Sequence, residues 1–416
     1  MTFQQGLSGL NAASKTLEVI GNNVSNAATV GFKSSTAVFA DVYAAALNGS
    51  GAATSQIGIG TNLTEVQQQF SQGNITTTEN PLDVAINGTG FFRLVSNGVT
   101  TYSRNGQFQL DKSGNLVSPT GSQLTGYIAD SNQVLATGAP QVLNLSTADQ
   151  PPKASTAVST VLNIDSRQAV PTSTPFAITD PNSYNNATEV SVFDSLGNSH
   201  SLQTFYVKTA DNTWNVYAAS DQTLIGAQPP AAATPVGQLV FGADGALTAA
   251  TKAAMPFSAV LPISTGATNP QTVTINYSGT TQFGSSFSVN TLEQDGYTSG
   301  HLAGFNIGSD GIIAGRYTNG KTATLGQIAL ANFANTNGLL ALGNNVWAET
   351  STSGSPLVGV PNSASLGVLQ ASAVEDSNVD LTAQLVNMIT AQRIYQANAQ
   401  TIKTQDSMLQ TLVSLR

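Results

Sequence analysis

Few residues in this chain have side chains suited to catalysis or metal binding. The two histidines, His200 and His301, lack a cysteine, a glutamate or a second histidine at the spacing of a metal site. His200 falls in a predicted hairpin, and we expect it to lie on the surface. Cysteine is absent from the chain, which excludes disulfides, thiol nucleophiles and cysteine-ligated metals. These residue types therefore indicate no catalytic or metal site.

The glycine-rich and acidic motifs lead to the same expectation. Gly88-Thr89-Gly90 comes nearest to a phosphate-binding loop, but the strand-forming pair Phe91-Phe92 follows it where a helix should begin. The chain has no G-x-S-x-G motif, its acidic residues are scattered, and its Asp-Gly pairs lack the ligand spacing of an EF-hand. We therefore predict a protein that is not an enzyme and that has no cofactor and no metal.

The surface is predicted to be polar but weakly charged. Charged residues make up 9% of the chain, against roughly 25% in ordinary soluble domains. The net charge is −9 and no run of Lys or Arg occurs, which argues against a nucleic-acid partner. Such a surface loses little hydration energy when a neighbouring subunit buries it. Composition alone leaves two classes open, a self-assembling subunit and a secreted β-rich protein.

The N-terminal segment lacks the features of a secretion signal. It has neither a basic start nor a continuous apolar run, so we expect no cleavable signal peptide. No stretch approaches the roughly 18 consecutive apolar residues that cross a bilayer, and we expect no membrane insertion. If the protein leaves the cytoplasm, its export route should recognise an uncleaved terminus.

The two ends of the chain have the residue spacing of helices that pack on other helices. Apolar residues recur every three or four positions, which predicts amphipathic helices that make subunit contacts. In the first segment this apolar stripe consists of Phe3, Leu7, Leu10, Leu17 and Val24. In the last segment it consists of Leu381, Leu385, Met388, Tyr395, Ala399, Ile402, Leu409 and Val413, widened by Ile389 and Leu412.

The C-terminal helix is strongly indicated. Neither Pro nor Gly interrupts residues 379–416, and Asn378 or Asp380 can cap its start. The two terminal helices are expected to form two strands of one coiled coil; the alternative is that each helix caps a domain of its own. Because isolated amphipathic helices are marginal in water, we expect both ends to be disordered in the monomer and to fold on assembly.

The interior of the chain has the pattern of β structure. Short alternating runs are separated by Asn-Gly and Asp-Gly pairs, which favour tight hairpin turns. We therefore predict a mainly β fold with α-helical termini. The expected parts are a terminal helical core (1–33 and 375–416), connecting segments (34–70 and 361–374), an inner β domain (71–145 and 285–360) and an outer β domain inserted in it (146–284). The Gly-rich stretches 50–60 and 351–367 are predicted to act as joints.

The segment that follows the first helix carries a specific motif. Residues 20–33 read IGNNVSNAATVGFK, which resembles the signature of the bacterial flagellar axial proteins, the rod, hook and junction subunits. Asn22, Asn23 and Asn26 suit the turn because asparagine caps backbone groups and tolerates left-handed conformations. Gly31 permits a sharp turn, and Phe32 provides an apolar anchor beyond it.

Further blocks resemble the hook subunits of this family. Residues 90–127 are similar to the first β block of rod and hook proteins, and 193–202 (FDSLGNSHSL) resemble a hairpin of the domain inserted in hook proteins. Residues 294–348 resemble the return through the inner β domain, and 377–416 resemble the terminal helix. The resemblance covers nearly the whole chain and is weakest at 146–190 and 210–285.

The resemblance implies a structural role. Terminal helices would form an inner core lining a channel, with two β domains outside it, in a curved, flexible tube that passes motor torque from rod to filament. It implies self-polymerisation, export by the flagellar type III apparatus and an extracellular location in the hook. It also implies contacts with the distal rod protein, the hook cap, the hook-length control protein and the hook–filament junction protein. The alternatives are a distal-rod or junction protein and a secreted β-rich adhesin.

Overall fold

The computed structural model describes residues 2–42, 58, 60–130, 133–146, 148–226 and 233–414. The chain forms two compact units. Unit 1 comprises Met1–Thr147, Gly304–Arg316 and Thr322–Arg416, and unit 2 comprises Ala148–Ala303 and Tyr317–Lys321. Most elements are strands, and a long helix lies at each end of the chain. The predicted fold class, mainly β with helical termini, is confirmed.

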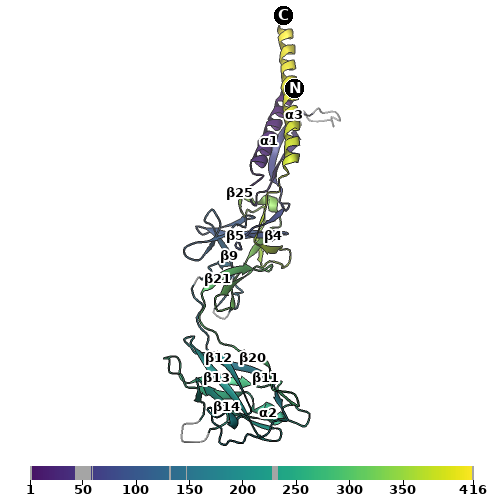
Figure 1. The fold of residues 1–416 in the computed structure, drawn as a ribbon. Helices are drawn as coiled ribbons and strands as arrows, with labels where there is room; N and C mark the ends of the chain where they lie inside the picture. The colour runs from purple at the N-terminus through teal and green to yellow at the C-terminus, as the bar shows by residue number, and fades with distance from the viewer. Residues whose placement is uncertain are drawn as a thin grey trace, which may run out of the picture. The chain divides into compact units, whose positions relative to one another are not determined.

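Two helices of unit 1 come from opposite ends of the sequence and lie side by side (Figure 1). They are α1 (Thr2–Ser25) and α3 (Leu381–Ser414). The start of α3 is capped by the Asp380 carboxylate, which accepts hydrogen bonds from the backbone N–H groups of Thr382 at 2.9 Å and Ala383 at 3.1 Å. Of the two predicted capping residues, Asp380 therefore caps the helix.

A β hairpin packs against α1. It consists of β1 (Ser35–Val42) and β2 (Gly60–Gln68), which pair antiparallel with a bulge between Val38 and Phe39. Gln5 of α1 donates to the carbonyl of Gly58 at 2.6 Å, and the Thr61 N–H donates to Ser8 Oγ at 3.3 Å. The region expected to be a connecting segment thus contains an ordered hairpin. Most of the predicted joint at 50–60 lies outside the described residues.

The remainder of unit 1 is built on a 13-stranded sheet whose main path runs β21-β22-β23-β9-β5-β6-β26-β25. Its core contains apolar side chains from neighbouring strands, among them Phe92, Leu124 and Leu330. The strands and the short 3-10 helix of this region are β3 (Ile75–Thr77), β4 (Val84–Asn87), β5 (Phe91–Ser96), β6 (Val99–Ser103), β7 (Gln109–Leu110), β8 (Leu116–Val117), β9 (Gln123–Ile128), β10 (Gln141–Val142), β21 (Leu302–Ile307), β22 (Ile312–Tyr317), β23 (Thr322–Ile328), β24 (Leu330–Asn332), η2 (Thr336–Gly338), β25 (Leu340–Gly343), β26 (Val346–Ala348), β27 (Leu357–Gly359), β28 (Val368–Ala371) and β29 (Ala373–Glu375).

The segment just before α3 belongs to the folded body of unit 1. Strand β28 pairs with β4, and β29 pairs with β3, both antiparallel. Leu366, Leu369 and Val374 are buried there. This differs from the predicted connecting segment at 361–374. The difference arises because each strand is only three or four residues long and pairs with a strand almost 300 positions earlier.

Unit 2 consists of two five-stranded sheets that share one apolar core. The core includes Trp214 and Tyr206 from one sheet and Leu162 and Ile275 from the other. The elements of unit 2 are β11 (Ala157–Asp165), η1 (Pro181–Ser183), β12 (Asn186–Phe193), β13 (Ser199–Ala210), β14 (Thr213–Ser220), β15 (Thr223–Leu224), β16 (Gly237–Val240), α2 (Ala249–Ala254), β17 (Phe257–Leu261), β18 (Gln271–Asn276), β19 (Thr281–Phe283) and β20 (Ser288–Gln294).

The boundary of the inserted unit differs from the predicted one at 284. Strand β20 pairs antiparallel with β11 from Val158↔Gln294 to Asn163↔Ser288, so the chain stays in unit 2 until Ala303. Residues 285–303 therefore lie in unit 2, whereas the sequence predicts them in the inner β domain. A strand of seven residues does not indicate by its own pattern which of two sheets it joins, because its partner β11 lies about 130 positions earlier in the sequence.

Candidate functional site

Small residues of α1 lie at its contact with α3. A Cβ atom at Gly6 would lie 3.0 Å from Ile402 Cγ1, and one at Gly9 would lie 2.8 Å from Asn398 Oδ1. Ala13 of α1 and Ala391 of α3 are buried. Since the positions on α3 fall as those on α1 rise, the two helices run antiparallel. Small residues allow their backbones to approach closely.

The predicted apolar stripes divide into two groups. Leu10, Leu17, Val24, Met388, Ala399 and Ile402 are partly covered within the chain. Exposed side chains form what we term the helix surface, which consists of Phe3, Leu7, Leu381, Leu385, Val386, Ile389, Ile394, Tyr395, Met408, Leu409 and Val413. The side chain of the remaining predicted residue, Leu412, lies outside the described residues. The helix surface therefore contains most of the large apolar side chains predicted for subunit contacts.

The C-terminal end of α3 extends beyond α1 (Figure 1). Because Gly6 lies beside Ile402, α1 begins within about one turn of that point. Leu409 and Val413 continue the spacing of Ile402 by roughly two and three further turns and are 54% and 77% exposed. This end of α3 continues the apolar stripe, but α1 of the same chain does not reach it.

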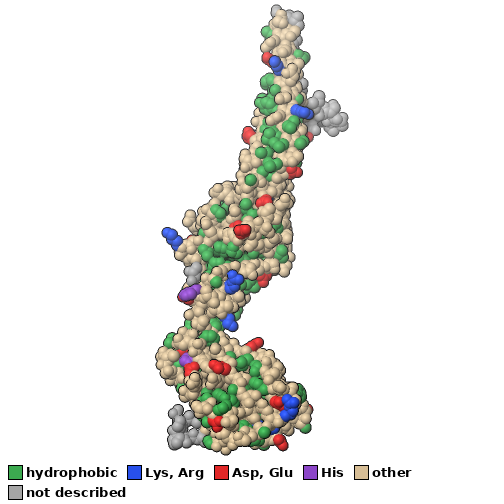
Figure 2. Space-filling view, in the orientation of Figure 1, with side chains coloured by type: hydrophobic (Ala, Val, Ile, Leu, Met, Phe, Trp, Pro, Cys, Tyr) green, Lys and Arg blue, Asp and Glu red, His purple; other side chains and the backbone are tan. Residues whose placement is uncertain are grey.

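The helices combine apolar exposure with little charge. Hydrophobic side chains are spread along the helical part of unit 1 (Figure 2). The sequence of α1 contains only Lys15 and Glu18 as charged residues, and that of α3 only Arg393, Lys403 and Asp406. Burying this surface against another chain would gain apolar contact while dehydrating few ions.

The asparagine-rich turn holds the end of α1 to the start of β1. The buried Asn23 side chain donates to the Ser35 carbonyl at 2.8 Å and accepts from the Ser35 N–H at 2.9 Å. Asn26 Nδ2 donates to the carbonyl of Asn22 at 2.9 Å and to its Oδ1 at 3.1 Å. These bonds give the asparagines the capping geometry that the motif predicts.

Gly31 and Phe32 place the turn against the inner sheet. Gly31 has φ +71°, and a Cβ there would lie 2.6 Å from the backbone N of Asn105. Phe32 is buried. A side chain at position 31 would meet both a steric clash and an unfavourable backbone conformation, which accounts for the glycine.

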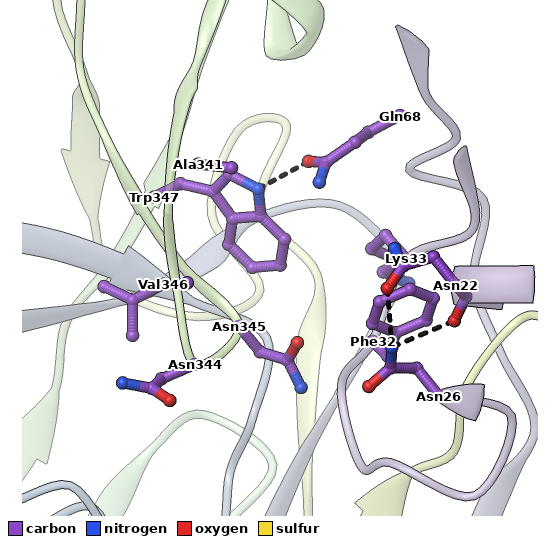
Figure 3. Close-up of a pocket in the computed structure, with 11 residues that line it drawn as sticks. Asn22, Asn26, Phe32, Lys33, Gln68, Ala341, Asn344, Asn345, Val346 and Trp347 are labelled. Atoms are coloured by element: carbon purple, nitrogen blue, oxygen red, sulfur yellow. Dashed lines mark hydrogen bonds between the residues drawn. The ribbon is translucent and has the colours of Figure 1, made fainter. Parts of the chain in front are cut away.

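A cavity of about 290 Å³ lies between this turn and the β25–β26 hairpin (Figure 3). Asn22, Asn26 and Phe32 line one side of it, and Asn345 and Trp347 line the other. Across this junction Asn345 donates to the Val30 carbonyl at 2.9 Å, and Trp347 donates to Gln68 Oε1 at 2.6 Å. These hydrogen bonds connect the terminal segment to the sheet beside the cavity.

A buried ion cluster ties three distant segments together. Glu375 Oε1 lies 2.6 Å from Lys33 Nζ, and Glu375 Oε2 lies 3.1 Å from Arg104 Nη1. The side chains of Glu375 and Lys33 are 0% exposed, and that of Arg104 is 4% exposed. Lys33 also donates to the Ser71 carbonyl at 2.7 Å. Lys33 follows α1 and Glu375 precedes α3, so the cluster holds both helices to the sheet through Arg104.

The electrostatics of this cluster reflect its burial. Loss of hydration lowers the pKa of Lys33 and the pKa of Arg104 below their ordinary values, against the opposing attraction of Glu375. Two cations thus depend on one carboxylate. The sequence indicated none of these three residues as a site; Lys33 closes the IGNNVSNAATVGFK motif, but its partners lie 71 and 342 positions away.

The histidines lie in different environments. His301 is exposed and contacts Asp149, whereas His200 is 7% exposed and not on the surface as predicted. It is buried because its strand, β13, lies between β12 and β14. Across the described residues, no group of three or more His, Asp or Glu side chains is arranged to hold a metal ion. No helix in the same ranges is long and apolar enough to cross a membrane.

The two terminal helices pack together and expose apolar side chains, and the β units lie between them in the sequence. This layout is typical of a self-assembling structural subunit. Four family models match it in order: flagellar basal body rod protein (3–33), flagellar hook protein FlgE/F/G D1 domain (85–192), flagellar basal body protein FlaE D2 domain (163–297) and flagellar basal body rod FlgEFG protein C-terminal (370–415). The chain belongs to the flagellar hook protein family.

Its relatives match over their full lengths. The flagellar hook protein FlgE of Salmonella typhimurium is 44% identical over 431 residues, and that of Escherichia coli K12 is 44% identical over 423 residues, each covering 100% of both chains. The crystal structure of Helicobacter pylori flagellar hook protein FlgE2 is similar in fold, with a TM-score of 0.51 and 13% identity over 72% of this chain and 100% of that one.

Proposed function

We propose that this chain is a structural subunit of the bacterial flagellar hook, which polymerises into a curved, flexible tube and transmits motor torque from rod to filament. The observation that carries the proposal is the helix surface, which presents large apolar side chains on both terminal helices. Family membership supports the same role. The chain acts mechanically, as a non-enzymatic building block without a cofactor.

The driving force for polymerisation is burial of the helix surface. Leu385, Ile389 and Leu409 are each about half exposed, at 50%, 51% and 54%. Covering the remaining half of such a side chain contributes about 1 kcal/mol. The contribution repeats at every subunit, whereas an isolated helix pair of this kind is marginal in water. Both helices therefore become fully ordered only when neighbouring copies cover them.

The β units provide the flexible exterior of the tube. Their surfaces are polar but carry little charge, so contacts between copies are numerous and individually weak. Such contacts can slide between near-equivalent arrangements while the helical core holds the subunits together. We assign the core to α1, its turn and α3, the inner domain to the sheet of unit 1, and the inserted outer domain to unit 2.

Partners and location follow from this role. Besides its own copies, the subunit would contact the distal rod protein, the hook cap, the hook-length control protein and the hook–filament junction protein. Export by the flagellar type III apparatus would deliver it to an extracellular position in the hook. The proposed role involves neither nucleic acid nor insertion into a membrane.

The proposal predicts that Leu385→Asp abolishes polymerisation and leaves the fold intact. Leu385 is 50% exposed, so a carboxylate at this position stays hydrated in the free subunit and is dehydrated only in the polymer. Tube formation is measured by electron microscopy, and folding of both units by thermal unfolding.

A matched control separates this effect from added charge. Val99, at the tip of the β5–β6 hairpin, is 60% exposed and does not lie on a helix. Val99→Asp introduces the same charge at another exposed apolar residue and should polymerise normally. If the Leu385→Asp chain forms tubes of ordinary length, Leu385 and the helix surface are not part of the assembly interface.

A further inference from the structure

His200 lies between two carboxylates in unit 2. Its Nδ1 is 2.7 Å from Asp221 Oδ2, and its Nε2 is 3.3 Å from Asp194 Oδ2. Asp194 begins the β12–β13 turn, and Asp221 lies in the β14–β15 turn. Both ring nitrogens of one buried histidine therefore face carboxylate oxygens, which come from two separate turns.

The neighbours of Asp194 favour its ionised form. Its Oδ1 accepts the N–H groups of Leu196 and Asn198, each at 2.9 Å. Its Oδ2 accepts Asn198 Nδ2 at 2.9 Å and Thr265 Oγ1 at 2.7 Å. Because both oxygens accept hydrogen bonds from N–H donors, the charged carboxylate is favoured, and these bonds hold the pKa of Asp194 low despite its burial.

Asp221 is held in the same form. Its Oδ1 accepts the Ser201 N–H at 2.9 Å, while its Oδ2 faces the histidine. Burial raises the pKa of Asp221, but the bonds from His200 and Ser201 outweigh that effect and lower it. The titratable groups facing the ring from the two turns are thus two carboxylates, and the loop preceding β18 contributes only the neutral Thr265.

A neutral imidazole cannot satisfy this arrangement. It carries one N–H, so one ring nitrogen would direct a lone pair at a carboxylate oxygen. An imidazolium donates from both nitrogens and places one positive charge between two negative ones.

We propose that His200 is a proton-binding site of unit 2, where the bound proton clamps the β12–β13 turn to the β14–β15 turn and its release as the pH rises loosens the unit. This site goes beyond subunit assembly, because it concerns the stability of the inserted unit and uses no residue of the helix surface.

The sign of the pH effect follows from the balance of forces on the ring. Burial lowers the pKa of His200, but the hydrogen bonds to Asp221 and Asp194 outweigh burial and raise it above the ordinary value of 6.5. The stabilisation is therefore fully present below about pH 6.5 and is lost as pH rises through the folded-state pKa. Each unit by which the pKa is raised changes the unfolding equilibrium constant about tenfold.

The first test measures the protonation state directly. The chain has two histidines, so ¹³C labelling of histidine in the full chain gives two ring signals, and His301→Gln identifies the one from His200. The His200 signal should titrate above the ordinary value of about 6.5. Asp221→Asn should shift that titration to lower pH. A His200 ring that titrates at or below about 6.5, or a titration that Asp221→Asn leaves in place, would overturn the proposal.

The second test measures the effect on stability. The chain has two tryptophans, Trp214 in unit 2 and Trp347 in unit 1, so Trp347→Phe leaves a fluorescent reporter of unit 2 alone. In that full-length chain the denaturant midpoint should fall between about pH 6 and about pH 9. The fall should disappear with His200→Gln and persist with the matched variant His301→Gln.

The measured quantity is the difference in denaturant midpoint between the two pH values. This difference can therefore be interpreted even if His200→Gln lowers the midpoint at both. Trp214→Phe provides a further control, because its reporter Trp347 lies in unit 1, which contains no histidine. A fall that survives His200→Gln, or one equally large in unit 1, would contradict the role of His200.

Discussion

At the scale of single residues, glycine decides how closely the terminal helices approach. Gly6 and Gly9 of α1 face Ile402 and Asn398 of α3, and a Cβ atom at Gly9 would lie 2.8 Å from the Asn398 side chain. Gly21 lies in the same helix, yet a Cβ there would meet nothing within 4 Å. Gly9 therefore has a packing role, whereas Gly21 only lowers the stability of the helix.

We predict different effects for Gly9→Ala and Gly21→Ala. At Gly21, alanine should stabilise the helix by about 0.5–1 kcal/mol, because it loses less conformational freedom on folding. At Gly9 the new methyl group would lie 2.8 Å from Asn398 Oδ1, so the Asn398 side chain must move and give up its hydrogen bond to the Ile394 carbonyl, which offsets the gain. Far-ultraviolet circular dichroism of the assembled protein during heating measures both changes. Equal stabilisation by the two variants would show that Gly9 does not make a close contact.

The periodicity of the terminal segments predicted which stretches are helical, but not which face meets the partner helix. Leu385 was expected in the contact but is 50% exposed, whereas Gly6 and Gly9 of α1 lie in it, Gly6 beside the predicted Ile402. A pattern search gives weight to large apolar side chains, and it cannot distinguish a face covered by the same chain from one left for another chain. The spacing of small residues at 6, 9 and 13 was the available signal.

At the scale of elements, the cluster of Lys33, Arg104 and Glu375 joins the terminal helices to the inner sheet. Every member is buried, and Glu375 is the carboxylate that both cations contact. Torque carried by the helices would pass to the sheet through this joint, alongside the bonds of Asn345 and Trp347.

Glu375→Gln should destabilise unit 1 by about 3–5 kcal/mol, because it leaves two buried cations without a counter-charge. Glu18→Gln is the matched control: Glu18 pairs with Lys15 at 2.7 Å on an exposed face of α1 and should cost no more than about 1 kcal/mol. Denaturation followed through Trp347 in a Trp214→Phe chain measures both variants. If the two variants lose similar free energies of unfolding, burial of the cluster does not make the stability of unit 1 depend strongly on Glu375.

Long-range pairing limited what the sequence could predict about elements. Alternating runs and Asn-Gly turns correctly indicated β structure, and the motif correctly indicated a turn after α1. Strands β20, β28 and β29 were assigned to the wrong side of a boundary or to none, because their partners lie far away in the sequence. Glu375 was missed for the same reason: its partners come from the two other segments of the cluster.

At the scale of the whole molecule, assembly and stability are assigned to different parts. In the proposed assembly the helix surface carries the contacts with other copies, whereas the β units have apolar cores of their own. We therefore expect a chain without its terminal helices to fold but not to polymerise.

Removing both helices tests the central claim most directly. A chain of residues 26–379 lacks α1 and α3 but keeps Lys33, Arg104, Glu375 and the strands β28 and β29. Sedimentation and electron microscopy of this chain should show a folded monomer at concentrations where the full chain forms tubes. If the shortened chain assembles into tubes by itself, the terminal helices do not drive polymerisation.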